Sequence, residues 1–159
     1  MDYFLWVLKI LLRKCVTKWF LRGLRLRLVA DMILGIGTDL VDIRRIERAI
    51  GRFPDKFSQR IFSKAEIREA KLRVNSIDSF AKRFAAKESL SKAIGTGFRK
   101  GMNFKDISII NDKYGKPKFK INNNVKKLIY SKYKIKKFKI SLSLADEKKY
   151  SIAFSVIHK

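Results

Sequence analysis

One segment, residues 80–101, most restricts what this chain can fold into, because it joins an apolar helical stripe to one acid and a glycine-rich end. Its apolar residues recur at three- and four-residue steps, which predicts a long helix with one face in the core. Glu88 follows Phe84 by four residues and so lies on or beside that stripe. We therefore expect Glu88 to be partly desolvated and to need a nearby cation.

The predicted helix ends at Gly95, and a basic, glycine-rich loop follows it. Gly95, Thr96 and Gly97 lead into Arg99, Lys100 and Gly101. A helix C-terminus carries partial negative charge, so a phosphate at this loop would depend on Lys92, Arg99 and Lys100 rather than on the helix. The segment thus offers an acid for a metal ion and bases for phosphate.

The charge of the chain narrows the class of partner. With 38 Lys and Arg against 14 Asp and Glu, the 159 residues carry a formal charge of +24. Such a surface attracts polyanions, namely nucleic acid, anionic lipid, phosphorylated cofactors or an acidic protein, although lysine-rich usage can also reflect genome composition alone. Aromatic stacking platforms and nucleic-acid motifs are missing, so no nucleic-acid partner is expected. Cys15 stands alone, which excludes an internal disulfide and suits a reducing, cytoplasmic compartment.

Residues 1–31 differ from the domain predicted at 32–159. Their apolar residues share one side of a helical wheel, and seven bases against two acids give a charge of +5. Charges interrupt the segment too often for a membrane span, although a basic amphipathic helix can lie on a membrane surface. Serine is absent and no small-residue cleavage site follows, so it resembles a targeting peptide only loosely. We interpret it as a non-essential extension, or as upstream sequence included by a mistaken start before Met32.

The predicted domain opens with a buried strand at residues 32–37, after which Thr38 and Asp39 would cap a helix reaching Ile50. Asp39 has two interpretations. An N-cap is the more common role for such a residue taken alone. A carboxylate at a strand end, where glycines allow close approach, can also hold a hard cation. The exposed side of this helix carries a row of arginines that is either a solvated face or a surface for an acidic partner: Arg44, Arg45, Arg48 and Arg52.

The remaining pattern predicts an α+β fold in which an antiparallel sheet packs with the long central helix. Pro54 starts a short helix, and Ser63 and Glu66 form a capping box for the next. Further elements are expected as strands at 104–110 and around 119–121, a helix at 125–133, and a hairpin of strands at 138–144 and 150–157.

The inventory of reactive residues excludes several kinds of catalysis. His158 is the only histidine and stands next to the last residue, which argues against a Ser-His or Cys-His pair, and no His and Cys cluster could hold zinc. Carboxylates and bases remain. Two carboxylates, with water and substrate oxygens completing an octahedron, commonly hold Mg²⁺. Metal-bridged phosphates flanked by bases are the working parts of phosphoryl-type transfer.

Four motifs in a fixed order add a resemblance to a family. They are Gly35-Ile-Gly-Thr-Asp39-Leu-Val-Asp-Ile43, Phe80-Ala-Lys-Arg-Phe-Ala-Ala-Lys-Glu88, Lys92-Ala-x-Gly-Thr-Gly97 and Gly115-Lys-Pro117. Over about residues 33–157 the chain resembles the holo-[acyl-carrier-protein] synthases, the short 4′-phosphopantetheinyl transferases. The resemblance implies a trimer with coenzyme A in clefts between subunits. It also implies that a serine of apo acyl carrier protein attacks the β-phosphate of coenzyme A, so that phosphopantetheine is transferred and adenosine 3′,5′-bisphosphate leaves, in support of fatty acid biosynthesis.

Carried over motif by motif, the resemblance makes Asp39 and Glu88 the ligands of Mg²⁺. Lys92 would contact the pyrophosphate and act with Glu88 in catalysis. The coenzyme cleft would be shaped by Lys92 together with Arg83, Lys87, Gly95, Thr96 and Gly97. The arginine row, Arg44, Arg45, Arg48 and Arg52, would meet the acidic carrier protein. For Arg83 and Lys87 the alternative is a solvated pair four residues apart on a helix.

Two points stay open in this interpretation. Some family members carry histidines in the strand before the last turn, but this chain has none at 141–146. The serine proton would then pass to Glu88 or to a metal-bound water, with Asp146 as a weaker candidate. The second point is a rival function, a nonenzymatic binder of nucleic acid or anionic membrane, which would use the basic surface and residues 1–31.

Overall fold

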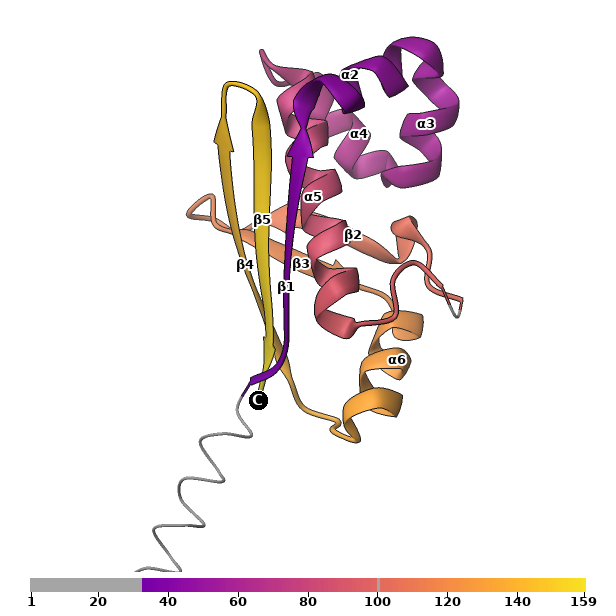
Figure 1. The fold of residues 1–159 in the computed structure, drawn as a ribbon, viewed down its shortest axis with the longest axis vertical. Coiled ribbons are helices and arrows are strands. Elements are labelled where there is room, and N and C mark those ends of the chain that lie inside the picture. The colour runs from indigo at the N-terminus through magenta and orange to yellow at the C-terminus, as the bar shows by residue number, and fades with distance from the viewer. Residues whose placement is uncertain (1–32, 100) are drawn as a thin grey trace, which may run out of the picture. The chain divides into compact units, whose positions relative to one another are not determined.

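The computed structural model describes residues 33–99 and 101–159, so the predictions for residues 1–32, including Cys15, and for Lys100 lie outside the described residues. Figure 1 shows the arrangement of the described elements. In chain order they are β1 (Ile33–Asp42), α2 (Ile43–Arg52), α3 (Pro54–Ile61), α4 (Lys64–Lys71), α5 (Ser76–Ile94), the 3₁₀ turn η1 (Phe104–Asp106), β2 (Ile107–Asn111), β3 (Pro117–Ile121), α6 (Asn123–Tyr133), β4 (Lys139–Glu147) and β5 (Tyr150–His158).

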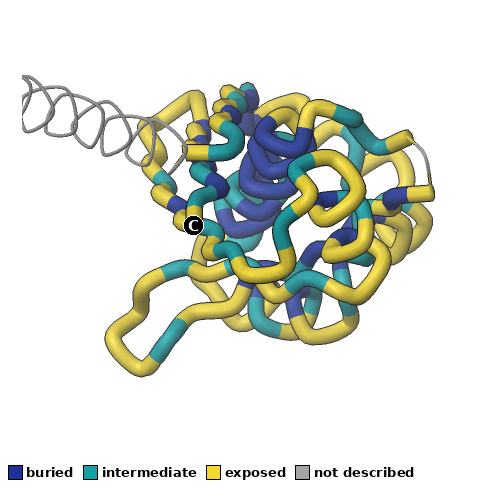
Figure 2. Tube along the Cα trace, turned by 90° about the horizontal axis from the view of Figure 1, so that it is seen from below, coloured by how far each residue is buried: buried dark blue, intermediate teal, exposed yellow. Residues whose placement is uncertain are grey.

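The fold of residues 33–159 is an antiparallel sheet with α5 packed along one face, which confirms the predicted α+β class. The sheet has the strand order β1-β5-β4, and β2 and β3 form a separate hairpin. The short helices α2, α3 and α4 gather at one end of α5, while α6 lies near its other end (Figure 1). The buried part of the backbone concentrates in the middle of this domain (Figure 2). Among the described helices, none is both long and apolar enough to cross a membrane.

Small residues allow the backbone of α5 to pack directly against the sheet. Gly37 on β1 pairs with Ser155 on β5, and both face the helix. The hydroxyl of Ser155 shares a 2.5 Å hydrogen bond with that of Ser89 on α5. A side chain on Gly37 would overlap the carbonyl oxygen of Ser89 and lie 2.5 Å from the backbone nitrogen of Ala93. The glycine therefore sets the distance between β1 and α5.

The predicted boundary between the first strand and the first helix is wrong. Strand β1 continues to Asp42, because its pairing with β5 extends through Asp39 to the end of the strand. Asp42, and not Thr38 or Asp39, is the N-cap of α2, and its Oδ1 accepts a 2.9 Å hydrogen bond from the backbone nitrogen of Arg44. The spacing of Leu40 and Ile43 fits a helix, but it fits equally well a strand that ends where a helix begins. Only the pairing with β5 shows which of the two interpretations is right.

Most other predicted elements are confirmed. Helix α5 ends at Gly95, whose φ of 76° is the left-handed conformation that glycine adopts without a steric penalty. The capping box is present, with Ser63 and Glu66 bonded reciprocally. The strand predicted to begin at residue 104 starts at Ile107, because the residues before it form η1.

Candidate functional site

The predicted site residues Asp39 and Lys92 meet across the contact between β1 and α5. Lys92 Nζ lies 2.6 Å from Asp39 Oδ1, although the two residues are 53 positions apart in the chain. Strand alternation places Asp39 on the same face as Gly37, directed toward α5. Close packing at Gly37 therefore brings the carboxylate within reach of the helix.

Glu88 lies one helical turn before Lys92 and is half-buried, as its position beside the apolar stripe predicts. Burial raises the pKa of the Glu88 carboxyl, and the negative charge of Asp39 raises it further, while the Lys92 ammonium lowers it. The hydroxyl of Ser91 lies 3.4 Å from Glu88 Oε2. Two carboxylates thus lie close enough to disfavour each other's charge, and a bound cation would relieve that repulsion.

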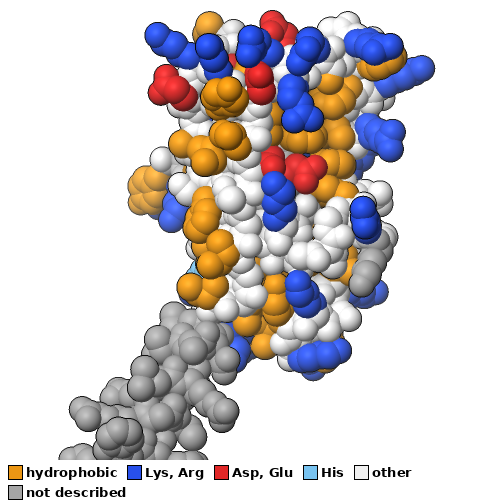
Figure 3. Space-filling view, viewed as in Figure 1, with side chains coloured by type: hydrophobic (Ala, Val, Ile, Leu, Met, Phe, Trp, Pro, Cys, Tyr) orange, Lys and Arg blue, Asp and Glu red, His pale blue; other side chains and the backbone are white. Residues whose placement is uncertain are grey.

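These residues line a cleft of about 360 Å³ between β1, α2, α3 and α5. One part of its wall is polar, and the other is apolar. In Figure 3, acidic and basic side chains lie together in the middle of this face with hydrophobic side chains beside them. The cleft has room for a ligand with both a charged and an apolar part. Its lining is Asp39, Leu40, Val41, Arg45, Ile46, Ala49, Phe57, Phe84, Glu88 and Lys92.

The donor set fits a hard divalent cation of the kind that keeps part of its hydration. Among residues 33–99 and 101–159, no group of three or more His, Cys, Asp or Glu residues could enclose a metal ion. Mg²⁺ is usually bound by one or two carboxylates with water and substrate phosphate oxygens, so two acids are enough. Asp39 and Glu88 supply that pair. A cation bound beside Glu88 would lower the pKa of its carboxyl again, because positive charge favours the carboxylate.

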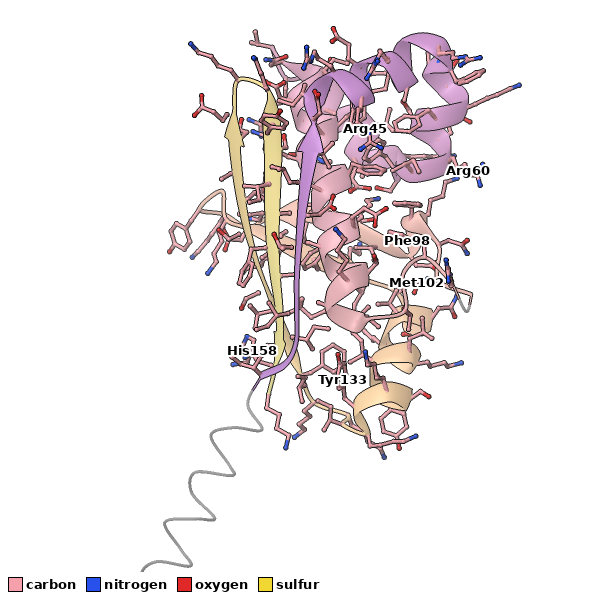
Figure 4. All side chains as sticks on the ribbon, in the orientation of Figure 1. Arg45, Arg60, Phe98, Met102, Tyr133 and His158 are labelled. Atoms are coloured by element: carbon pink, nitrogen blue, oxygen red, sulfur yellow. The ribbon has the colours of Figure 1, made fainter. Side chains whose placement is uncertain are left out.

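The glycine-rich loop begins one helical turn beyond Lys92. Gly95 and Gly97 both have positive φ, 76° and 60°, and Thr96 Oγ1 donates to the carbonyl of Gly97 at 3.1 Å. Sequence reasoning missed two residues of α6 that contact the end of α5 here, Lys132 and Tyr133. Tyr133 appears beside this helix end in Figure 4, where Phe98 and Met102 mark the chain that follows. Both α6 residues lie far along the chain, in a segment whose lysines all look like surface residues.

Lys87 does not reach the cleft, because its side chain is fully buried on another side of α5. Its ammonium donates to Glu66 Oε2 at 2.9 Å and to the carbonyl oxygens of Ile61 and Phe104 at 2.8 and 3.2 Å. Burial lowers the pKa of Lys87, and the Glu66 carboxylate opposes that effect. Lys87 is therefore tied to α3, α4 and η1, and the alternative of a solvated pair with Arg83 is wrong.

Arg83 is also buried and lies apart from the cleft. Its guanidinium donates to the carbonyl and hydroxyl of Ser79 and forms a 3.0 Å ion pair with Glu69. Arg83 lines a second cavity, of about 580 Å³, together with Gly115, Pro117 and the ion pair of Lys82 with Asp146. Asp146 stands on β4, across the sheet from β1, so it does not enter the Asp39 cleft of its own chain.

The arginine row of α2 is exposed, as predicted. Arg45 lines the cleft and is labelled on α2 in Figure 4. Arg44 pairs with Asp42 at 3.4 Å, Arg48 Nε donates to the carbonyl of Arg44, and Arg52 lies over the ring of Phe53. Arg45 is therefore the member of the row that connects it to the cleft.

Replacing Gly37 by alanine should damage the site through backbone packing alone. The added Cβ would push α5 away from β1, which we expect to cost about 3 kcal/mol of stability from overpacking. A displacement of about 1 Å between Asp39 and Glu88 should lower any activity of the site roughly 100-fold. Gly51→Ala is the matched control, since nothing lies within 4 Å of the Cβ it would add. Equal urea midpoints and rates for the two variants would contradict this account.

Comparisons with known proteins agree with the arrangement. The model of the 4′-phosphopantetheinyl transferase superfamily matches residues 35–155. A holo-[acyl-carrier-protein] synthase of Pelagibacter ubique is 49% identical over 127 residues, covering 80% of this chain and 98% of its own. The crystal structure of the Neisseria meningitidis synthase has a TM-score of 0.72 at 39% identity, covering 80% of this chain and 100% of its own. The Helicobacter pylori synthase, solved in complex with coenzyme A, has a TM-score of 0.64 at 33% identity, covering 77% and 98%. This chain therefore belongs to the 4′-phosphopantetheinyl transferase superfamily.

Proposed function

We propose that this protein is a Mg²⁺-dependent holo-[acyl-carrier-protein] synthase that acts in the cytoplasm and supports fatty acid biosynthesis. A serine Oγ of apo acyl carrier protein forms a bond to the β-phosphorus of coenzyme A. The bond from that phosphorus to the bridging oxygen breaks, and adenosine 3′,5′-bisphosphate leaves with that oxygen. The observation that carries the proposal is the convergence of Asp39, Glu88 and Lys92 in one cleft of a chain from this superfamily.

The residues of the cleft supply distinct parts of this reaction. Asp39 and Glu88 would hold Mg²⁺, which neutralises negative charge on the bridging oxygen as it leaves. Lys92 would contact the pyrophosphate, and its position in the lining of the cleft supports this role. The serine proton would pass to Glu88 or to a metal-bound water, since both would lie at the reacting phosphate.

Coenzyme A is proposed to lie between subunits of a trimer. In support, the face of the sheet that points away from α5 carries large apolar side chains, which are exposed to solvent in a single subunit. Ile36 and Leu40 on β1 are 55% and 60% exposed, and Ile152 and Phe154 on β5 are 42% and 45% exposed. Figure 3 shows hydrophobic side chains on the strand side of the domain. The cavity at Arg83 would then complete the coenzyme cleft of a neighbouring subunit.

The arginine row is the proposed docking surface for the acidic carrier protein. Arg44, Arg45, Arg48 and Arg52 are exposed on one helix, and Arg45 reaches the cleft itself. Opposite charges across an interface raise the association rate more than the final affinity, and salt screens the effect. The carrier would therefore arrive with its serine beside the pyrophosphate.

Intact-mass measurement on apo acyl carrier protein tests the proposal. Incubation with the protein, coenzyme A and Mg²⁺ should add the mass of one phosphopantetheine group, and EDTA should prevent the addition. No mass gain, even with the enzyme at the concentration of its substrate, would reject the function.

The rival binding function is separated by removing residues 1–31. The transferase should keep its activity in that shortened chain. A nonenzymatic binder would instead lose its salt-sensitive attachment to DNA or anionic vesicles, and Glu88→Gln would not affect that attachment.

A further inference from the structure

The C-terminal end of α5 is held by two side chains from the last turn of α6. Tyr133 donates its hydroxyl to the carbonyl oxygen of Ala93 at 2.9 Å. Lys132 Nζ donates to the carbonyl oxygen of Ile94, the last residue of the helix. The last four carbonyls of a helix have no donor within the helix, so α6 supplies donors that α5 lacks.

Lys132 has an electrostatic consequence that Tyr133 does not share. The carbonyl end of a helix carries a partial negative charge and repels anions. A phosphate at the Gly95–Gly97 loop would sit directly beside that end. The Lys132 ammonium lies against Gly95, close enough that a Cβ there would overlap it, and so cancels the charge where a phosphate would feel it most.

The ammonium also keeps donors for a ligand. An ammonium has three N–H donors, and among the described residues Lys132 uses one, on Ile94. Within the same residues it belongs to none of the ion pairs, whereas Lys92 is paired with Asp39. Its contacts are the carbonyl of Ile94 and the ring of Tyr133, whose centroid lies 5.3 Å from the ammonium. No carboxylate of the described residues is therefore paired with the ammonium in place of an anion.

We propose that Lys132 is an additional phosphate-binding residue of this site. Its ammonium bridges the last carbonyl of α5 and an oxygen of the pyrophosphate of coenzyme A at the Gly95–Gly97 loop. The inference rests on the proposed function for the identity of the ligand, and on the contacts of Lys132 for the binding of an anion. It explains how a phosphate can be accepted next to a helix C-terminus.

The test compares Lys132→Met with Lys126→Met, which removes the same charge from an exposed position of the same helix. Lys132→Met should raise KM for coenzyme A about tenfold, as expected for a lost hydrogen bond to a charged group, with kcat and the KM for the carrier protein nearly unchanged. Lys126→Met should change none of these, and Lys132→Arg should restore most of the affinity. Tyr133→Phe separates charge from mechanical support, because it removes only the other tie to α5.

In the kinetic measurements, three outcomes would overturn the inference: an unchanged KM in Lys132→Met, an equal rise in Lys126→Met, or an equal rise in Tyr133→Phe. Calorimetric titration of Mg²⁺-pyrophosphate into the full chain keeps this test independent of transfer activity. If the parent transfers no phosphopantetheine but binds pyrophosphate about tenfold more tightly than Lys132→Met does, the proposed function fails and the anion site stands. If the two bind pyrophosphate equally, the anion site fails whatever the activity.

Discussion

Glu88→Gln is expected to reduce phosphopantetheine transfer by about 10²–10⁴-fold, the range for losing a positioned general base, and further if the metal site is lost as well. Asp39→Asn should cause a loss of several orders of magnitude too, because an amide keeps the contact with Lys92 but not the charge that attracts a cation. Initial rates from the intact-mass assay measure both variants. Glu147→Gln, an exposed acid at the β4–β5 turn, is the control and should leave the rate unchanged.

Glu88→Gln should not harm the fold, and its effect on the free energy of unfolding should depend on pH. Above the raised pKa of Glu88, the native state carries a charge that burial and Asp39 disfavour, so Glu88 lowers stability there. As the pH falls through that raised pKa, the carboxyl takes up a proton and the penalty disappears. Without divalent ions, Glu88→Gln should thus be more stable than the parent at neutral pH and equal to it in acid. Near-normal transfer by both Glu88→Gln and Asp39→Asn would reject the metal assignment.

Lys87→Met is expected to cost about 3–5 kcal/mol of stability, the usual penalty for leaving one partner of a buried ion pair uncompensated. Glu66 is 1% exposed, and without Lys87 its Oε2 would keep only the backbone nitrogen of Ser63. The carbonyls of Ile61 and Phe104 would lose a donor as well. A small domain has a margin of about 5–15 kcal/mol, so much of the protein should unfold at low urea concentration.

Lys82→Met is the matched control, since Lys82 also lies on α5 and pairs with an acid at a similar distance. The two pairs measure 2.9 Å for Lys87 with Glu66 and 3.0 Å for Lys82 with Asp146. The Lys82 pair is exposed, with 32% and 43% of its side chains accessible, and exposed pairs contribute about 0–1 kcal/mol. Urea unfolding followed by circular dichroism measures both. Equal losses would show that burial does not set the strength of these pairs.

The sequence was most informative where the determining contacts are local. The end of α5 at Gly95, the capping box at Ser63 and the proline start of α3 all depend on residues within one turn, and all were predictable. The convergence of Asp39 and Glu88 was predicted through a resemblance rather than through geometry. Gly37 explains that convergence, but the effect of a missing side chain becomes visible only once α5 is in place.

The errors and omissions share a physical cause, which is dependence on distant partners. Asp39 and Asp42 are equally good caps by composition, and only the pairing of β1 with β5 decides which one ends the strand. Lys87 looks like a surface lysine in the sequence, and only the packing of α3, α4 and η1 around it buries its side chain. Lys132 sits in a lysine-rich segment with no local signal that it reaches α5, 38 residues earlier in the chain.

Helix α5 forms part of the core with one face and carries the proposed reacting groups, Glu88 and Lys92, on another, and this double role limits which of its residues can vary. Most of its 19 residues are buried, and they include Arg83 and Lys87. Substitutions in α5 would change stability and turnover together, so few of its positions should accept a substitution without an effect. Altered preference for a carrier or an acylated coenzyme should instead be sought in α2 and the loop after Gly95. Directed evolution libraries are best aimed at those segments.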